Sequence, residues 1–380
     1  MLKTKIFAGL SVSLFLLAAF SVVGAASASG PGAVYTIDNA SPTNHVLQYQ
    51  GGSNGVLSLA GTFSAQGAGT GSALASQGAV QLTQDGHWLL VVDAGSNQIT
   101  VFQVNGGGSL ALADVVASQG STPISLTVNH DIVYVLDSAT PNIAGFALSS
   151  NGQLTFIPGS IQPLSGISSS SPEQIGFVST SSGGPDQGAQ GQGGSVLVVT
   201  EKAAGVIDTY AVSSSGVASA PTVTPSNGGG PYGFTTAQGY LILTEAGTGS
   251  LSSYAVSNSG SLRTLSGAIP DFGNAGSTTG PAPCWVAVSR DGQFAYVSNA
   301  HVGTISVYGI SGTGILRLDS SISAHTLVPT LDLAVSGNNH YLYALNGGQI
   351  TSFQVYQGGS IAQASAVGGV PASAAGLAAT

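Results

Sequence analysis

The stretch QDGHWLLVVDAGSNQITVFQV, residues 84–104, predicts two β-strands joined by a short turn. Asp93 follows its apolar run LLVV, and Gly, Ser and Asn mark a turn before the second strand, ITVFQV. The second strand places an apolar residue, Ile99, three positions before an aromatic residue, Phe102. The repetition of this two-strand unit along the chain decides the fold.

The spacing of an apolar residue three positions before an aromatic residue recurs throughout the sequence. It occurs seven times at intervals of 44 to 64 residues, each time after a β-rich run that ends on a polar residue. Repetition of one strand-rich unit is the sequence signature of a repeat architecture. The seven copies are Val46–Tyr49, Ile99–Phe102, Ile143–Phe146, Ile207–Tyr210, Leu251–Tyr254, Ile305–Tyr308 and Ile350–Phe353.

Two further predicted strands flank each copy. A strand that often opens with Pro precedes it, as in PISLTV (123–128), and a Gly turn leads to a fourth strand, as in NGQLTFI (151–157). Seven units of four short strands predict an all-β protein, a seven-bladed β-propeller with four-stranded blades. The first unit begins at its second strand, VYTID (34–38), and PASAAGLAAT (371–380) begins like the missing first strand. Pairing of this C-terminal strand with the N-terminal blade would close the ring.

Residues 1–28 have the organisation of a secretory signal peptide. Two lysines precede an apolar run, and the small residues ASA (26–28) form a cleavage site. An uncleaved membrane anchor is the alternative interpretation. We expect an exported protein, extracellular or periplasmic, whose residues 29–380 form one propeller domain with no membrane insertion after cleavage. Residues 180–194, rich in Gly, Gln and Ser, are expected to be a flexible loop inserted in that domain.

The composition excludes several classes of function. Only 6% of the residues are charged, with six Lys and Arg against fifteen Asp and Glu. So few cations cannot neutralise several phosphates, which excludes nucleic-acid binding and attraction to an anionic membrane. The single cysteine, Cys284, excludes an intramolecular disulfide. We expect a monomer, and the scarcity of ionisable groups predicts a fold that tolerates acid.

A polar residue ends the second strand of every unit, and strand alternation places all seven on one face of the propeller, which we call the top face. This top ring could bind a metal ion or a sugar through its oxygens, or each side chain could cap a turn by accepting backbone N–H bonds. Because the polar residue recurs in all seven units, a role that every blade requires explains it better, which favours the capping of turns. No His or Cys spacing is typical of a zinc site, so no metal or cofactor is expected. The top ring comprises Asp38, Asp93, Asp137, Glu201, Glu245, Asn299 and Asn346.

Blades four to six differ most from the others at the top face. Directly after the Pro that opens their first strands come Glu173, Tyr232 and Cys284. Glu173 is the candidate general acid or base, because a carboxyl beside Tyr232 in a narrow opening would have its pKa raised toward neutrality. Lys202, the one cation expected on this face after the signal, is a candidate to stabilise an oxyanion. A solvated loop acid and a lysine paired with a neighbouring carboxylate are the alternative interpretations.

The remaining candidates extend this cluster. We expect Glu201 and Glu245 to join Glu173 and Lys202 as catalytic groups. Cys284 beside an aromatic residue could act as a nucleophile, but a small buried apolar role is favoured. The expected substrate-binding residues are Tyr232, Cys284, Trp285, Asn299 and His301.

The chain resembles the lactonase family of seven-bladed propellers, which contains 6-phosphogluconolactonases and carboxymuconate-cyclising enzymes. The resemblance lies in 84–104, VLVVTEKAAGVIDTYAV (196–212), PYGF with LTEAG and SSYAV (231–256), and PCWVAVSRDGQFAYVSNAHVGTISVY (283–308). It implies a propeller fold and the opening of a cyclic ester, as in exported bacterial members. The residues of this chain that match the motifs of the family, and that the resemblance therefore implies as site residues, are Glu201, Glu245, Cys284 and Trp285.

Two segments depart from the family pattern. Enzymes of the family carry His or Arg where this chain reads SQGAVQL (76–82) and TPISLTV (122–128). Without these cations, a phosphorylated sugar lactone is not the expected substrate. The first hypothesis is therefore a lactonase-like hydrolase of a neutral or weakly charged small-molecule lactone. The second is a non-catalytic binding propeller for an extracellular glycan, peptide or cell-surface component.

Overall fold

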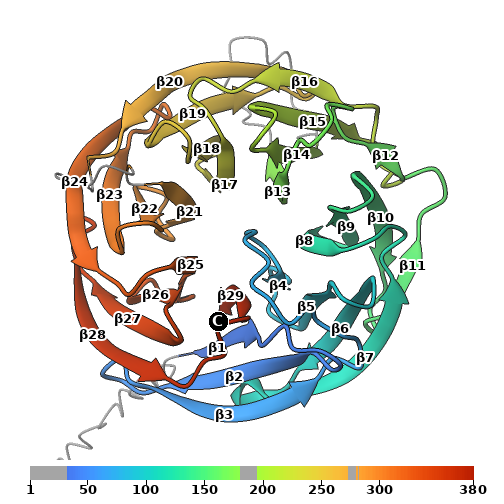
Figure 1. Cartoon of the computed structure of the whole chain (residues 1–380), viewed down its shortest axis with the longest axis horizontal. Coiled ribbons are helices and arrows are strands. Elements are labelled where there is room, and N and C mark those ends of the chain that lie inside the picture. The colour runs from blue at the N-terminus through green and yellow to red at the C-terminus, as the bar shows by residue number, and fades with distance from the viewer. Residues whose placement is uncertain (1–31, 180–194, 273–279, 281) are drawn as a thin grey trace, which may run out of the picture.

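The computed structural model describes residues 32–179, 195–272, 280 and 282–380, so the predicted signal at 1–28 and the predicted loop at 180–194 lie outside the described residues. Seven β-sheets surround a central axis as the blades of a propeller (Figure 1). The prediction of an all-β, seven-bladed propeller is confirmed. In the described part of the chain, no helix has the length and hydrophobicity needed to cross a bilayer.

The strands of each blade run outward from the axis in chain order, apart from the closing strand of blade 1. Blade 1 comprises β29 (Ala375–Ala379), β1 (Ala33–Ile37), β2 (His45–Gly51) and β3 (Leu57–Ser64). Blade 2 comprises β4 (Val80–Leu82), β5 (Trp88–Asp93), β6 (Gln98–Val104) and β7 (Leu110–Ala117), and the short 3₁₀ turn η1 (Gly106–Gly108) precedes β7. Blade 3 comprises β8 (Pro123–Asn129), β9 (Ile132–Asp137) and β10 (Asn142–Leu148), and β11 (Leu154–Phe156) and β12 (Gln162–Pro163) share its outer edge.

Blades 4 to 7 follow the same plan without interruption of the outer strand. Blade 4 comprises β13 (Pro172–Ser179), β14 (Ser195–Glu201), β15 (Val206–Val212) and β16 (Thr222–Pro225), and blade 5 comprises β17 (Pro231–Ala237), β18 (Tyr240–Glu245), β19 (Ser250–Val256) and β20 (Leu262–Pro270). Blade 6 comprises β21 (Pro283–Val288), β22 (Phe294–Asn299), β23 (Thr304–Ile310) and β24 (Leu316–His325). Blade 7 comprises β25 (Thr330–Val335), β26 (Tyr341–Asn346), β27 (Gln349–Val355) and β28 (Ile361–Gly368).

The repeated apolar and aromatic residues form the contacts between blades. Residues three apart in a strand point to opposite faces of the sheet. Accordingly, Ile207 packs in the cluster shared with blade 5, whereas Tyr210 packs in the cluster shared with blade 3. All seven aromatic residues of the motif are at most 2% exposed, so burial of these rings explains why the motif recurs.

The C-terminal strand closes the ring as the sequence predicts. Strand β29 lies beside β1 (Figure 1) and pairs with it in antiparallel orientation. Tyr35 is opposite Ala378, and Ile37 is opposite Ala375. The Thr36 hydroxyl also donates to the carbonyl of Ala375. β29 takes the innermost position of blade 1, so it covers the edge of β1 and completes the fourth strand of this blade.

A segment that precedes β4 crosses the central channel, which the sequence does not predict. In Figure 1 this blue trace reaches the middle of the ring. The Ser76 hydroxyl donates to the carbonyl of Ile124 in blade 3, and the Gln77 amide donates to the carbonyl of Val286 in blade 6. The expected first strand of blade 2 is therefore short, because residues 74–78, here called the channel segment, leave the sheet to bind blades 3 and 6.

Candidate functional site

A β-bulge near the start of the innermost strand aims the candidate side chains in blades 4 to 6. The register shifts between Pro172 and Gln174 in β13, and in the same place in β17 and β21. A bulge leaves one residue out of the ladder and redirects its side chain. The residue at the bulge is Glu173 in blade 4, and its counterparts are Tyr232 and Cys284.

The candidate site is a pocket of about 770 Å³ on the top face of blades 3 to 5. Its walls come from the connection between blades 3 and 4 and from the ends of β9, β13 and β14. Four of the predicted site residues, Glu173, Glu201, Lys202 and Tyr232, line it. The structure therefore brings together the predicted carboxylates and the predicted cation of blade 4.

Glu173 is a buried carboxyl at the edge of this pocket, only 6% exposed. The Ser171 hydroxyl donates to its Oε1 at 3.0 Å. Burial raises the pKa of Glu173 to about 7, although the charge of Lys202, the hydrogen bond from Ser171 and the neighbouring Tyr232 hydroxyl lower it. Glu173 can therefore exist in both protonation states near neutral pH, as a general acid or base requires.

Lys202 and Tyr232 both act on the Glu173 carboxyl and contact each other. The Lys202 Nζ lies 4.8 Å from the centre of the Tyr232 ring, a cation–π contact, while the Lys202 side chain remains exposed. The Tyr232 hydroxyl donates to the carbonyl of Ala75 in the channel segment. Lys202 is thus placed beside the pocket with its ammonium accessible to a bound substrate.

Cys284 and Trp285 lie behind Tyr232 rather than in the pocket. Burial raises the pKa of the Cys284 thiol to about 12, so this thiol is protonated at neutral pH and lacks the character of a nucleophile. The Trp285 ring meets the Tyr232 ring edge-on at 5.3 Å between centroids. The Trp285 Nε1 donates to the carbonyl of Ser76 at 3.1 Å. Both residues pack in one cluster with Tyr232, and Trp285 also binds the channel segment.

Glu245, Asn299 and His301 do not line the pocket. Glu245 is fully buried and accepts the backbone N–H of Gly228 at 3.2 Å. Asn299 is also fully buried, and His301 is exposed in the turn that follows β22. The predicted cluster is therefore divided, with blade 4 and Tyr232 at the pocket and these three residues elsewhere.

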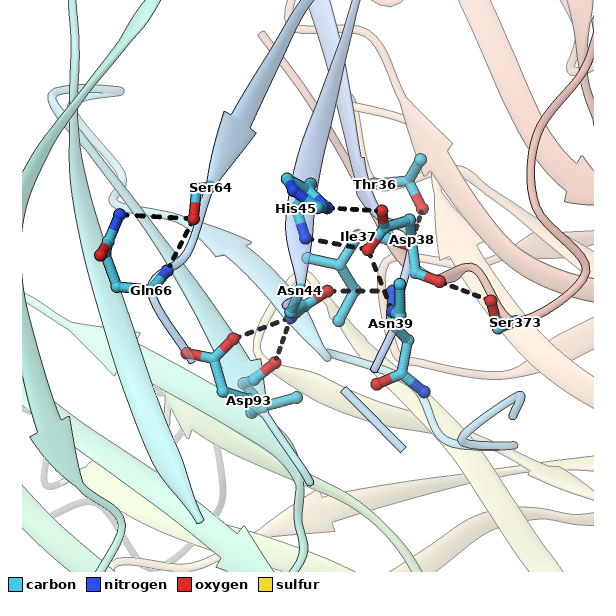
Figure 2. Close-up of polar contacts among 12 residues, drawn as sticks. Thr36, Ile37, Asp38, Asn39, Asn44, His45, Ser64, Gln66, Asp93 and Ser373 are labelled. Atoms are coloured by element: carbon cyan, nitrogen blue, oxygen red, sulfur yellow. Dashed lines mark hydrogen bonds and ion pairs between the residues drawn. The ribbon is translucent and has the colours of Figure 1, made fainter. Parts of the chain in front are cut away.

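The top ring holds the connecting loops of the top face. The Asp38 carboxylate accepts the backbone N–H and the Nδ1 of His45, both at 2.8 Å, and Asp93 accepts the Asn44 amide at 2.8 Å (Figure 2). In blade 4, Glu201 Oε1 accepts the backbone N–H of Ser165 at 3.0 Å. Among the described residues, no group of three His, Cys, Asp or Glu is arranged to hold a metal ion.

Sequence reasoning missed three features of this region. The channel segment carries no motif, so only the structure shows that it supports Tyr232. Asp332 is a buried carboxyl of β25 that accepts the backbone N–H of Leu377 at 3.0 Å and thereby ties β29 to blade 7. Asp208, a buried carboxyl beside Glu201, did have a signal, because it replaces a hydroxyl residue at the second position of the repeated motif in several other blades.

Replacement of Trp285 by Phe tests whether the channel segment depends on blade 6. Trp285→Phe leaves the buried carbonyl of Ser76 without its donor, so we expect the free energy of unfolding to fall by about 1–3 kcal/mol. Chemical denaturation measures this change. Trp88→Phe, the same substitution at a half-buried position of blade 2, is the control and should cost less. An equal or smaller loss for Trp285→Phe would refute this role.

The sequence matches the family model described as lactonase, 7-bladed beta-propeller, over residues 29–166 and 198–331. The chain belongs to this lactonase family. A search of curated protein sequences found no match. The family assignment agrees with the blade count and with the resemblance described for the sequence.

Solved structures of other proteins share this lactonase fold at low sequence identity. A protein from Bacteroides fragilis, provisionally named a 6-phosphogluconolactonase, has a TM-score of 0.67 and 14% identity over 92% of this chain and 98% of its own. The periplasmic gluconolactonase of Pseudomonas aeruginosa has a TM-score of 0.65 and 17% identity over 90% of this chain and 98% of its own. At these identities, the likeness shows the fold alone.

Proposed function

We propose that this lactonase-family propeller hydrolyses a neutral or weakly charged lactone in the top-face pocket. The observation that carries the proposal is the Glu173 carboxyl, which is buried at a pocket of about 770 Å³ and has a pKa of about 7. Such a carboxyl can take a proton from water and return it within one turnover at neutral pH. Membership of the lactonase family supports ester opening as the reaction.

The proposed reaction needs one water molecule and no other reactant. The Glu173 carboxylate takes a proton from the water, whose oxygen forms a bond to the lactone carbonyl carbon. The resulting oxyanion is stabilised by the Lys202 ammonium. The ring C–O bond then breaks, and the proton held by Glu173 passes to the departing alkoxide oxygen. The product is an open-chain hydroxy acid.

The charge of the pocket supports an uncharged substrate. Among the described residues that line it, Lys202 is the one cation, and its charge already acts on Glu173. No second cation is therefore present there to hold a phosphate. Serine hydroxyls and apolar side chains such as Ile124 and Leu164 supply much of the remaining surface. The name of the Pseudomonas aeruginosa relative, a periplasmic gluconolactonase, agrees with an uncharged sugar lactone and with export.

A substrate panel tests this proposal directly. Purified protein is assayed with neutral five- and six-membered lactones and with a phosphorylated sugar lactone, after subtraction of spontaneous hydrolysis. We expect turnover of at least one neutral lactone and about tenfold or more slower turnover of the phosphorylated one. Preference for the phosphorylated lactone would overturn the substrate class. Glycan binding without turnover of any neutral lactone would replace the enzymatic function with a binding function.

A further inference from the structure

Two fully buried carboxyl groups lie side by side in blade 4: Glu201, which lines the pocket, and Asp208, which does not. Asp208 on β15 is paired with Val199 on β14, and Glu201 follows two positions later on the same face of the sheet. Asp208 Oδ1 and Glu201 Oε2 are both buried, and neither accepts a hydrogen bond from a donor group of another described residue. Because ionised carboxylates only accept hydrogen bonds, these two groups can satisfy each other only by sharing a proton.

Other blades place a hydroxyl group where blade 4 has Asp208. In blade 2, the Thr100 hydroxyl donates to the Asp93 carboxylate at 2.6 Å. In blade 7, the Thr351 hydroxyl is the partner of Asn346. A hydroxyl group keeps its proton at every physiological pH, whereas a carboxyl must be protonated to donate. The residues at this position of blades 2, 4, 5, 6 and 7 are Thr100, Asp208, Ser252, Ser306 and Thr351.

The carboxyl pair and Tyr210 hold the beginning of the pocket wall. The Tyr210 hydroxyl donates to the carbonyl of Pro163 at 3.0 Å, and the backbone N–H of Ser165 donates to Glu201 Oε1 at 3.0 Å. Residues 164–171, which we call the wall loop, continue from there along the pocket. The loop ends at Ser171, whose hydroxyl donates to Glu173.

We propose that Asp208 is a positioning residue that, in its neutral form, donates to Glu201 and so holds the wall loop against the pocket. Loss of the shared proton would leave two negative charges side by side in a buried space. Their repulsion would displace Glu201, to which the backbone of Ser165 is bonded, and so loosen the loop. The placement of Ser171 beside Glu173 would then be lost as well. An effect of this arrangement on catalysis rests on the proposed function. The positioning of the wall loop by Asp208 is independent of that function.

The surroundings of Asp208 set the direction of the pH dependence. Among the described residues, Glu201 on β14 and Tyr210 on β15 are the titratable groups that act on Asp208. Burial, followed by the hydrogen bond and the charge of Glu201, raises the pKa of Asp208 to about 8, although Ser165 and Tyr210 lower it. The wall loop is therefore expected to be held below about pH 8 and to loosen above it.

Hydrogen exchange of peptides covering 163–171 tests this inference without a substrate. Exchange is measured at pH 6 and pH 9.5 and corrected for the intrinsic rate. In the unmodified protein, we expect protection to fall about tenfold or more at the higher pH. Asp208→Asn, whose amide donates at every pH, should lose this dependence. Peptides covering 64–69, the loop near Asp93 and Thr100, serve as an internal control that should change less.

Two results would overturn the inference. One is equal protection of 163–171 at both pH values in the unmodified protein, and the other is an unchanged pH dependence in Asp208→Asn. If Asp208→Asn does not fold, Asp208→Ser, which introduces the residue of blades 5 and 6, replaces it in the same measurement. Failure of the lactone panel together with the expected exchange result would reject the proposed function and leave the positioning role standing.

Discussion

Glu173→Gln is expected to lower kcat/KM for a neutral lactone by about 100- to 10,000-fold. Glutamine has nearly the shape of glutamate and can still accept a hydrogen bond from Ser171, but it cannot take a proton from water. The variant should therefore keep the fold while losing the general base. Steady-state kinetics at pH 7.5, with circular dichroism as the check on folding, measures both effects.

Asp137→Asn is the matched control for this variant. Asp137 is a buried acid of the top face, and burial raises its pKa to about 7, as it does for Glu173, but it does not line the pocket. Its replacement should leave kcat/KM within a few-fold of the unmodified protein. Equal losses for the two variants would attribute the Glu173 effect to general destabilisation. Full activity of Glu173→Gln would reject the proposed base.

The pH profile of hydrolysis provides an independent check on the same residue. If the Glu173 carboxylate is the base, kcat/KM should fall with an apparent pKa near 7 as the pH is lowered. Lys202 lowers the pKa of Glu173 through its positive charge, so in Lys202→Met the acidic limb of the pH profile, where kcat/KM falls, should move to higher pH. A limb that stays in place would show that another group controls the rate.

The protein is expected to be more stable at pH 4 than at pH 8, which is the reverse of ordinary acid denaturation. Burial raises the pKa values of Asp93 to about 6, of Asp137 and Glu173 to about 7, and of Asp208 and Asp332 to about 8. These groups have values near 4 in the unfolded chain, so between pH 4 and pH 8 the folded protein binds more protons. The contribution of these five groups to the free energy of unfolding is therefore fully present below about pH 4, and it is lost as the pH rises through 6 to 8.

The size of this effect should reach several kcal/mol, because one unit of pKa shift corresponds to about 1.4 kcal/mol and five groups contribute. Asp85 acts in the opposite direction, since Thr83 and His87 hold its pKa at about 2, but its exposed position makes its contribution small. Urea denaturation from pH 4 to pH 8 measures the free energy of unfolding. Asp332→Asn, which cannot titrate, should flatten the dependence. A free energy that rises from pH 4 to pH 7 would contradict the prediction.

The sequence predicts the blades well because their information is local. The alternation of apolar residues and the turn residues between them specify each strand. The buried motif pair, such as Ile207 and Tyr210, specifies the contact with both neighbours. Even the closing strand β29 is predictable, because the ends of the chain each supply only part of a blade.

The candidate site is only partly predictable. Glu173 and Tyr232 are found by comparing equivalent positions of the repeats, since each differs from its counterparts. Lys202 is found as the one cation expected on the top face after the signal. Glu245, Asn299 and His301 share the top face but not the pocket, because equivalent positions of separate blades lie around the ring rather than beside one another. Conversely, Asp208 belongs to the pocket surroundings although its strand lies farther from the axis.

By itself, the sequence determined that this chain is a seven-bladed propeller of the lactonase type and that its acids greatly outnumber its cations. The tertiary structure decided which of those acids act together. The hydrogen bond from Gln77 to Val286 spans 209 positions of the chain, and the contact of Tyr232 with Ala75 spans 157. Contacts of this length form only when the ring closes around the axis, so no local pattern encodes them. The burial that raises the pKa of Glu173 arises from the same closure.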